Sequence, residues 1–357
     1  MSRIGILTSG GDCPGLNAVL RAASRACESR GWELVGFCDG FEGLLPPANH
    51  RLLDRRATNG LLHLGGTIIG TVNRGHFLCR QPGRPGVFIP AEILGKVRQT
   101  FQSLGLRALI VVGGDGSLST ALHMHQCGLP VVGVPKTIDN DIDATDRTFG
   151  FDSAVECVVS SLDRLHTTTT SHKRIMVVEV MGRHAGWIAL HGGLAGGADV
   201  ILIPEIPFGI DAILRAVAER EARGAHSHMI VIAEGARPRN GWARPSPTNS
   251  SERRPSNAAE LLVRELSDAT PREVRFCILG HLQRGGSPVF SDRILGTAFG
   301  VKAVELIEAG LLGHMASLRN GSMASVTIAD AVHQMRRVEP TCEAIRTARA
   351  TGISFGD

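Results

Sequence analysis

Residues 108–146 constrain the fold of this chain more than any other stretch. The stretch opens with the apolar run ALIVV, which is partly β-branched and typical of a buried parallel strand. The glycine-rich residues 113–117 (GGDGS) follow, and we expect a helix to begin after Ser117. A second strand over residues 131–135 leads into residues 136–141 (KTIDND), a loop rich in carboxylates. This order predicts a βαβ unit in an open α/β sheet.

The two loops of this unit offer complementary chemistry. Glycines let several backbone N–H groups point at one anion, and a helix N-terminus adds partial positive charge, so residues 113–117 suit a phosphate. Asp115 lies inside this turn, where an unpaired carboxylate would repel phosphate, and Mg²⁺ between them resolves the conflict. The second loop offers Asp139 and Asp141 as possible bases. A glycine turn alone is often only structural, but nothing in folding requires both loops together.

Composition limits the classes of function that this chain can have. Its 357 residues allow two domains. The formal net charge of +4 gives no electrostatic case for a nucleic-acid partner. The eight cysteines lack metal-binding spacing, which fits a reducing cytosol, and neither a membrane-spanning run nor a signal peptide is predicted. We therefore expect a cytoplasmic protein without a membrane partner.

Beyond the first unit, apolar runs and glycine turns alternate along the chain. A helix is expected over residues 149–165. Three further segments lack periodicity and are expected to be irregular. They are the hydroxyl-rich run 167–171, the glycine-rich turn 192–199, and the Pro-, Ser- and Arg-rich residues 237–257, which we expect to be a mobile loop.

GGDGS followed by PKTIDND resembles the phosphofructokinase family, and further motifs fit the same family over roughly residues 3–310. The resemblance implies an α/β fold with two similar Rossmann-like, three-layer domains, mainly parallel sheets, and an active site in the cleft between them. It implies a nucleotide-binding domain over residues 1–149 plus about 283–315, a sugar-phosphate domain over residues 150–282, and a C-terminal segment over residues 316–357.

The resemblance assigns the phosphoryl donor, ATP with Mg²⁺, to three glycine-rich stretches, which are residues 9–15, 65–75 and 113–117. Asp115 is the residue expected to hold Mg²⁺. A donor-phosphate arginine of the family falls on Asn73 in an ungapped comparison, and we assign it to Arg74 because arginine can bind phosphate through two parallel hydrogen bonds. The expected nucleotide-binding residues are Gly11, Arg74, Gly75, Gly114, Asp115, Gly116 and Ser117.

The implied reaction transfers the terminal phosphoryl group of ATP to the 1-hydroxyl of fructose 6-phosphate, giving fructose 1,6-bisphosphate and ADP. Asp139 would take the hydroxyl proton because it is the first carboxylate of the TIDND loop, and Asp141 would support it. Arg183 and Thr137 would stabilise charge on the moving phosphoryl group.

The residues expected to bind the phosphoryl acceptor, fructose 6-phosphate, lie near the ends of predicted strands over residues 175–180, 229–233 and 274–279. By resemblance, Arg174 and Arg275 reach the sugar phosphate of a neighbouring subunit, which requires at least a dimer. The family suggests a homotetramer with active sites shared between subunits. The expected acceptor residues are Thr137, Asp139, Arg174, Met181, Gly182, Arg183, Glu234, Arg275, His281 and Arg284.

Two residues bear on the choice of donor. Gly116 matches the ATP-using members, because a side chain there would crowd the nucleotide, whereas Lys136 matches the pyrophosphate users. We give Gly116 more weight, because a blocked nucleotide site is decisive and a lysine beside a phosphate is not. The alternatives are a pyrophosphate-dependent phosphofructokinase, an NAD or lipid kinase with a similar GGDG loop, and a non-catalytic regulatory subunit.

The allosteric effector site of the family is only partly matched. Its matching arginines are Arg21, Arg25, Arg55 and Arg223. His166 and Ala225 stand where regulated bacterial enzymes carry arginine and lysine, and Asp199 replaces a metal-chelating glutamate. Because lost cations weaken a phosphate site, we expect activation by ADP and inhibition by phosphoenolpyruvate to be weakened.

Overall fold

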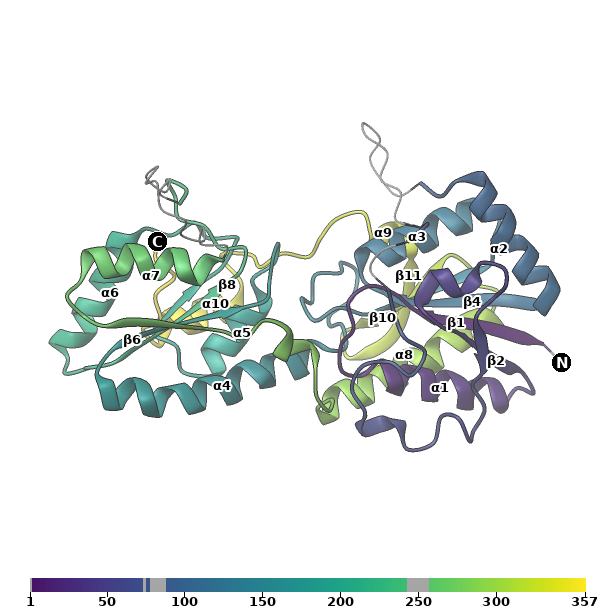
Figure 1. The fold of residues 1–357 in the computed structure, drawn as a ribbon, viewed down its shortest axis with the longest axis horizontal. Helices are drawn as coiled ribbons and strands as arrows, with labels where there is room; N and C mark the ends of the chain where they lie inside the picture. Colours follow the sequence, from purple (N-terminus) through teal and green to yellow (C-terminus); the bar gives the residue numbers. More distant parts are fainter. Residues whose placement is uncertain (1, 73–74, 78–87, 243–256) are drawn as a thin grey trace. The chain divides into compact units, whose positions relative to one another are not determined.

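In the computed structural model, the chain forms two compact units, and each is built on a mainly parallel sheet (Figure 1). The expected α/β class is confirmed. Unit 1 consists of Met1–Ser153 and Arg284–Arg336, and unit 2 of Ala154–Gln283 and Arg337–Asp357. The structure describes residues 2–72, 75–77, 88–242 and 257–357.

The sheet of unit 1 has the strand order β11-β10-β5-β4-β1-β2-β3. Its inner strands are parallel, and antiparallel partners close both edges. The central strands β1, β4 and β5 have apolar, buried stretches because both faces of the sheet are covered. The strands are β1 (Arg3–Thr8), β2 (Glu33–Phe37), β3 (His50–Leu52), β4 (Leu106–Gly113), β5 (Val131–Pro135), β10 (His314–Arg319) and β11 (Ser322–Thr327).

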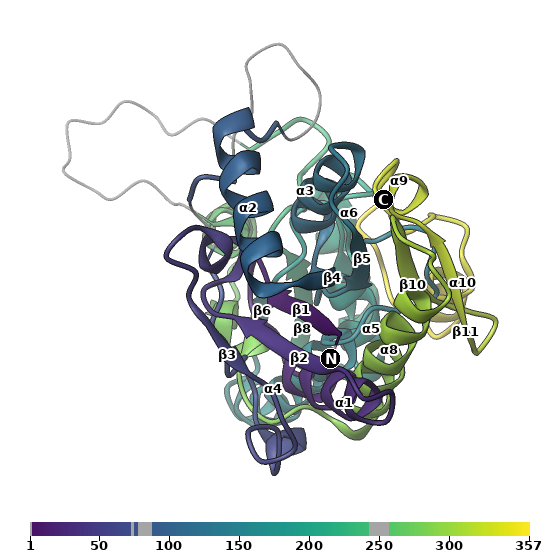
Figure 2. The ribbon, with the colours of Figure 1, turned by 90° about the vertical axis from the view of Figure 1, so that its right-hand side faces the viewer.

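Helices α1 and α8 lie on one face of this sheet, and α2 and α3 lie on the other (Figure 2). Glycines allow α1 and α8 to approach closely, because a Cβ at Gly300 would lie 2.6 Å from the carbonyl oxygen of Val19. The helices are α1 (Leu16–Glu28), α2 (Ala91–Leu104), α3 (Asp115–Gln126), α8 (Phe290–Glu308) and α9 (Ile328–Ala331), with short 3₁₀ turns η1 (Gly40–Leu44) and η2 (Leu61–His63).

The sheet of unit 2 is wholly parallel among the described residues, in the order β7-β8-β6-β9. Its central strands supply fully buried side chains such as Val177 and Val231. The elements are α4 (Phe151–His172), β6 (Ile175–Val180), α5 (Trp187–Ala195), β7 (Val200–Leu202), α6 (Ile210–Ala222), β8 (His228–Ala233), α7 (Ala258–Ala269), β9 (Val274–Ile278), η3 (Gly280–Arg284) and α10 (Glu343–Ala350).

Two expectations about irregular segments are wrong. The hydroxyl run 167–171 is the end of α4, not a loop. Its hydroxyls bond back to helix carbonyls, with Thr167 donating to Arg164 (2.8 Å) and Ser171 donating to Thr167 (2.8 Å), so the run continues the helix. The turn expected over residues 192–199 likewise begins inside α5.

The expected C-terminal segment, residues 316–357, is divided between the two units. The antiparallel hairpin of β10 and β11 extends the sheet of unit 1 beyond β5. Helix α10 belongs to unit 2 and packs against α5. The polar sequence of this region hid both contributions, because its apolar residues are scattered rather than gathered into runs.

A buried carboxylate joins α8 to the start of α4 within unit 1. Asp292 is fully buried and accepts hydrogen bonds from the N–H groups of Gly150 and Ser153 (both 2.8 Å) and from the Ser153 hydroxyl (2.6 Å). It therefore satisfies N–H groups at the first turn of α4, which lack helical acceptors. Burial is the main cause that raises the pKa of Asp292 to about 6.

This raised pKa predicts a pH-dependent stability. The folded state holds the Asp292 proton more tightly than the unfolded state, so this group's contribution to stability falls as pH rises from its unfolded pKa, near 4, through about 6. Relative to an Asp292→Asn variant, the free energy of unfolding of the native chain should fall by on the order of 1–2 kcal/mol between about pH 5 and pH 8. Urea unfolding of both proteins measures this difference. A difference that does not change with pH would contradict the assignment.

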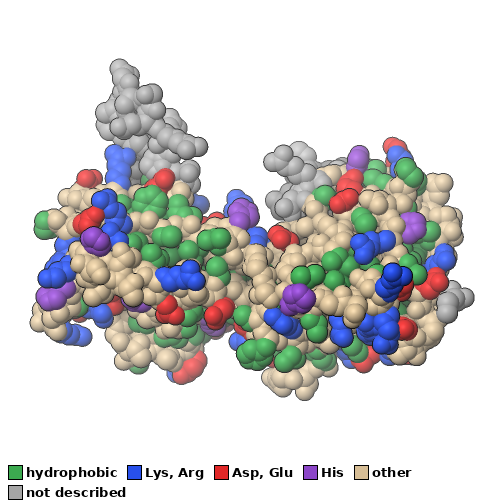
Figure 3. Space-filling model, turned by 60° about the horizontal axis from the view of Figure 1, so that its bottom comes forward, with side chains coloured by type: hydrophobic (Ala, Val, Ile, Leu, Met, Phe, Trp, Pro, Cys, Tyr) green, Lys and Arg blue, Asp and Glu red, His purple; other side chains and the backbone are tan. Residues whose placement is uncertain are grey.

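Charged side chains of both signs occur on the face of the molecule shown in Figure 3. On the face shown in Figure 3, basic and acidic side chains are interspersed rather than gathered by sign. This agrees with the small net charge of +4. No helix in the described part of the chain combines the length and apolarity needed to cross a membrane.

Candidate active site

A pocket in unit 1 lies where three neighbouring strands, β1, β4 and β5, end. This is the carboxyl edge of the sheet, where open α/β proteins bind ligands. The predicted residues that line it are Gly11, Gly75, Gly114, Asp115, Gly116, Ser117, Lys136, Thr137 and Arg284. Sequence reasoning missed Ser9, Gly10, Phe41, Glu42, Val72, Phe77 and Thr120, which line the same pocket.

Helix α3 begins earlier than expected and brings its first turn into the pocket. The expected start after Ser117 is wrong, because α3 begins at Asp115 and the N–H of Leu118 already donates to the carbonyl of Gly114 (2.9 Å). The N–H groups of residues 115–117 precede this first helical bond and have no acceptor within the helix. Together with the helix dipole, they make this turn suitable for a phosphate.

The space available for a side chain differs between two glycines of this turn. A Cβ at Gly113 would lie 2.3 Å from the Cβ of Ser117, so only glycine fits there. At Gly116, by contrast, a Cβ would meet no atom within 4 Å. A side chain at Gly116 would therefore project into open space at the pocket without disturbing the protein, and its effect would fall on a bound ligand.

Two cations, one buried and one half-buried, contact the glycine-rich turn that follows β1, residues 9–15. The Lys136 side chain is 4% exposed, and its ammonium donates to the carbonyl oxygen of Gly11. Burial lowers the pKa of Lys136. The Arg284 guanidinium donates to the carbonyl of Asp12 (3.1 Å) and occupies the space that a Cβ at Gly11 would need. Arg284, predicted to bind the sugar phosphate, thus lies in the unit 1 pocket.

The carboxylate loop after β5 is fixed by residues that sequence reasoning did not assign. Thr148 donates its hydroxyl to the carbonyl of Thr137 (2.7 Å) and its N–H to the side chain of Asn140 (3.0 Å). Asn140 has a φ of 51°, which asparagine tolerates well. Asp139 and Asp141 lie on this loop and are half-buried, but they are not among the residues that line the pocket.

An apolar wall faces the glycine turns in the same pocket. The rings of Phe41 and Phe77 stack, with centroids 5.2 Å apart and planes 25° apart, and both residues are buried. Val72 and Gly75 complete this side. Phosphate groups do not need such a wall, but an aromatic or nucleoside group does. Sequence gave no periodic signal for these rings because they lie in a 3₁₀ turn and a loop.

The acceptor residues of unit 2 meet at the carboxyl ends of β6 and β8. The N–H of Glu234 donates to the carbonyl of Val180 (2.9 Å), and that of Gly235 donates to the carbonyl of Gly182 (3.2 Å). Gly182 has a φ of 129°, which requires glycine. The structure therefore brings Met181, Gly182 and Arg183 together with Glu234.

Gln283 connects this loop to the turn that carries His281. Its fully buried side chain accepts from the N–H of Met181 (3.2 Å) and donates to the carbonyl of Gly280 (3.1 Å). Gln283 stands between His281 and Arg284 in the sequence GHLQRGG, but sequence reasoning gave it no role of its own. A buried amide that satisfies two backbone groups positions both loops.

The two remaining arginines expected to bind the acceptor lie at the amino ends of the strands, opposite to the ends that carry Arg183 and Glu234. Arg174 comes directly before β6, and Arg275 is opposite Met176 in the parallel pairing of β9 with β6. A strand of this length spans roughly 20 Å, so these arginines lie far from Arg183 and His281, which follow the other ends of the strands. Arg174 bonds to the Thr168 hydroxyl (2.9 Å), and Arg275 pairs with Glu273 (2.7 Å).

Some predicted residues lie outside the part of the chain that the structure describes. They are Arg74, its neighbour Asn73, and residues 243–256 of the segment expected to be a loop. The assignment of the donor-phosphate arginine to Arg74 therefore stays a prediction.

The model of the phosphofructokinase family matches residues 3–307. The chain belongs to the phosphofructokinase family. It is 49% identical over 355 residues to an ATP-dependent 6-phosphofructokinase of Chloroflexus aurantiacus, covering 99% of this chain and 98% of the relative. It is 43% identical over 363 residues to ATP-dependent 6-phosphofructokinase 2 of Clostridium perfringens, covering 100% and 99%. The crystal structure of Pichia pastoris phosphofructokinase in the T-state matches with a TM-score of 0.79 and 32% identity, covering 93% of this chain and 35% of that chain.

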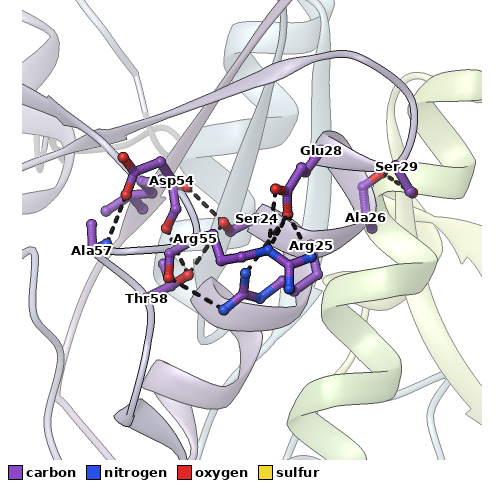
Figure 4. A network of polar contacts seen from close by, with 10 residues as sticks. Ser24, Arg25, Ala26, Glu28, Ser29, Asp54, Arg55, Ala57 and Thr58 are labelled. Atoms are coloured by element: carbon purple, nitrogen blue, oxygen red, sulfur yellow. Dashed lines mark hydrogen bonds and ion pairs between the residues drawn. The ribbon is translucent and has the colours of Figure 1, made fainter.

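Some residues that the family resemblance places at the effector site form ion pairs with other side chains of this chain. Arg25 and Arg55 both contact the carboxylate of Glu28, at 3.7 Å and 3.1 Å (Figure 4). The hydrogen bond from Arg55 is the main cause that lowers the pKa of Glu28. In unit 2, Asp199 pairs with Arg220 at 2.6 Å. A phosphorylated effector would have to compete with these carboxylates.

The pocket in unit 1 fits Mg²⁺ bound together with a phosphate-bearing ligand. Among the described residues, no group of three or more His, Cys, Asp or Glu side chains could hold a metal by itself. Mg²⁺ commonly takes only one or two carboxylates and completes its shell with water and phosphate oxygens. The carboxylate of Asp115, at a turn suited to phosphate, matches this donor set.

Proposed function

We propose that this chain is an ATP-dependent 6-phosphofructokinase of glycolysis, acting in the cytoplasm on fructose 6-phosphate. The observation that carries the proposal is the pocket in unit 1, where the phosphate turn of α3 faces the apolar wall of Phe41 and Phe77. Pyrophosphate would use the turn but not the wall, whereas a nucleotide uses both. The names of the curated relatives support the same donor, and the pyrophosphate-dependent alternative is not favoured.

Unit 1 would bind the donor. The N–H groups at the start of α3, with Gly11 and Arg74, would bind its phosphates. Asp115 would hold Mg²⁺, which supplies charge neutralisation between phosphate oxygens when bound. Lys136 is occupied with the carbonyl of Gly11, so we propose that it fixes the glycine turn and does not select pyrophosphate.

The loop after β5 would carry the chemistry. Asp139 would accept the proton of the 1-hydroxyl, and Asp141 would support it in this role. Thr137, which lines the donor pocket, and Arg183 would stabilise charge on the phosphoryl group as it moves. The hydrogen bonds of Thr148 keep this loop in place during the reaction.

Unit 2 would bind the acceptor. Met181, Gly182 and Glu234 meet at one sheet edge and would hold the sugar ring and its hydroxyls. His281, on the turn that Gln283 fixes, would bind the 6-phosphate together with Arg284. A charged partner from another subunit would complete this phosphate site.

We propose that Arg174 and Arg275 complete the sugar-phosphate site of a second copy. They lie at the opposite sheet edge from His281, roughly 20 Å away along the strand, so one copy cannot use both sets on one phosphate. Strand β9 is an edge strand, and its exposed Phe276 (41%) and Ile278 (38%) offer apolar surface beside Arg275. A homotetramer with shared sites satisfies both features.

Mixing two inactive variants tests this shared site. Arg275→Ala and Arg183→Ala should each be nearly inactive as pure proteins. When they are co-expressed under different tags, the hybrid that carries both should recover about a quarter of native activity, because random pairing leaves that share of shared sites intact. Hybrids as inactive as the pure variants would contradict sharing, since every site would then still contain one lesion.

Identification of the product tests the proposed activity. With ATP and Mg²⁺, the chain should convert fructose 6-phosphate into fructose 1,6-bisphosphate, with the new phosphate at carbon 1 by phosphorus NMR. Removal of Mg²⁺ by a chelator should abolish turnover. Phosphorylation at another carbon would contradict the assigned acceptor, and an inactive chain would favour the regulatory-subunit alternative.

A further inference from the structure

A cavity of about 720 Å³ lies in unit 2 beside the acceptor residues. Residues that follow β6, β7 and β8 line it, so it occupies the carboxyl edge of three neighbouring strands. Arg183 and Glu234 belong to its lining, but Met181 and His281 do not. The cavity therefore begins at the acceptor residues and extends away from them toward β7. Its size is that of a small-molecule site.

The lining of this cavity is basic. Four arginines contribute to it, Arg183, Arg237, Arg239 and Arg337, against the two glutamates Glu179 and Glu234. The excess of two positive charges favours an anionic ligand. Arginine binds phosphate through paired, charge-assisted hydrogen bonds, which makes a phosphorylated molecule the best match.

The carboxylate of Glu205 fixes the backbone close to two of these arginines. Glu205 accepts from the N–H of Gly186 (3.0 Å) and from the N–H of Val338 (2.9 Å). Gly186 follows the loop that carries Arg183, and Val338 follows Arg337 directly. The backbone next to each arginine is thus fixed to the same side chain, so their placement around one cavity is built into unit 2.

Two backbone hydrogen bonds with Phe208 fix the segment that carries the other two arginines. The N–H of Phe208 donates to the carbonyl of Arg237 (3.3 Å), and the N–H of Arg239 donates back to the carbonyl of Phe208 (2.8 Å). In extended backbone, residues two apart point to the same side. Arg237 and Arg239 are exposed and both line the cavity, and the buried Pro238 between them also contributes to the lining.

A buried carboxyl group provides a different kind of contact. Glu179 is 5% exposed and accepts from the N–H of Ala259 (2.7 Å) at the start of α7. Burial raises its pKa. With Glu234, it supplies hydrogen-bond partners for hydroxyl groups rather than for phosphates. The lining therefore suits a ligand that has both hydroxyl and phosphate groups.

We propose that this cavity binds a phosphorylated polyol with at least two anionic groups, which regulates the enzyme by competing with fructose 6-phosphate. One anionic group would engage Arg237 and Arg239, and the other would lie at Arg183 and Arg337. Competition follows because Arg183 and Glu234 serve both ligands. The regulatory role rests on the proposed function, but the binding site does not.

Calorimetric titration without nucleotide or Mg²⁺ tests the site directly, with 2,3-bisphosphoglycerate and inorganic phosphate as probes. The bisphosphate should bind at least about tenfold more tightly than phosphate, since it engages two pairs of arginines. The double variant R237Q/R239Q should weaken bisphosphate binding by roughly 10- to 100-fold. Saturating fructose 6-phosphate should displace the probe.

Arg215→Gln is the matched control, because Arg215 is an exposed arginine of α6 in the same unit that does not line the cavity. It should leave probe binding unchanged. Equal affinities in the native chain and the R237Q/R239Q variant would overturn the site, and so would an equal loss in the control. Probe binding that fructose 6-phosphate does not affect would overturn the competition. If the chain has no kinase activity but binds the probe through Arg237 and Arg239, the proposed function fails and the site stands.

Discussion

Replacement of Asp139 by asparagine should lower the turnover number by roughly 10²–10⁴, the usual contribution of a positioned general base. The amide has the same shape as the carboxylate but cannot take the proton of the attacking hydroxyl. The loop should keep its conformation, because Asn140, Thr148 and Thr137 hold it through hydrogen bonds that do not use the Asp139 side chain. The Michaelis constant for fructose 6-phosphate should therefore change much less than the turnover number.

Asp143→Asn provides a matched control for this result. Asp143 lies on the same segment, and its carboxylate accepts a hydrogen bond from Gln334 (2.7 Å). Steady-state kinetics of both variants should show a large loss for Asp139→Asn only. Near-native turnover in that variant, or an equal loss in the control, would show that Asp139 is not the base.

Introduction of aspartate at Gly116 should remove the use of ATP. The new side chain would enter open space in the pocket, where a Cβ meets no protein atom within 4 Å. Its charge would lie beside the phosphates at the start of α3, and like charges at close range cost several kcal/mol. We expect catalytic efficiency with ATP to fall by roughly 10²–10³.

The fold should survive this change, because aspartate in the first turn of a helix interacts favourably with the helix dipole. Gly95→Asp on α2 serves as the control, since a Cβ there also meets no neighbour within 4 Å and the position lies outside the pocket. Both variants should melt like the native chain, and only Gly116→Asp should lose activity. Unchanged catalytic efficiency with ATP would mean that the phosphates of the bound nucleotide do not lie beside residue 116.

The strands at the centre of each sheet could be predicted from sequence because their signal is local. The run over residues 131–135 is apolar, the run over residues 175–180 is interrupted only by Glu179, both are rich in valine, and the structure places β5 and β6 there. The glycine turns that follow such runs located the unit 1 pocket for the same reason. A short apolar run next to glycine is compatible with few structures other than a buried strand and its turn.

Features that depend on long-range packing escaped prediction. The hydroxyl run at the end of α4 has no apolar period, and its side chains bond to their own helix. Phe41 and Phe77 stack although they are distant in sequence, and Gln283 connects two loops through a buried amide. None of these contacts leaves a pattern within a window of neighbouring residues, so only the folded structure shows them.

The measurement that tests the central claim most directly is phosphorylation of fructose 6-phosphate with Mg²⁺, with ATP and pyrophosphate supplied in parallel at matched concentrations. The account predicts turnover with ATP and a catalytic efficiency at least roughly tenfold lower with pyrophosphate, because only a nucleotide uses the wall of Phe41 and Phe77. Turnover with pyrophosphate alone would contradict it and would make Lys136, rather than Gly116, the residue that selects the donor.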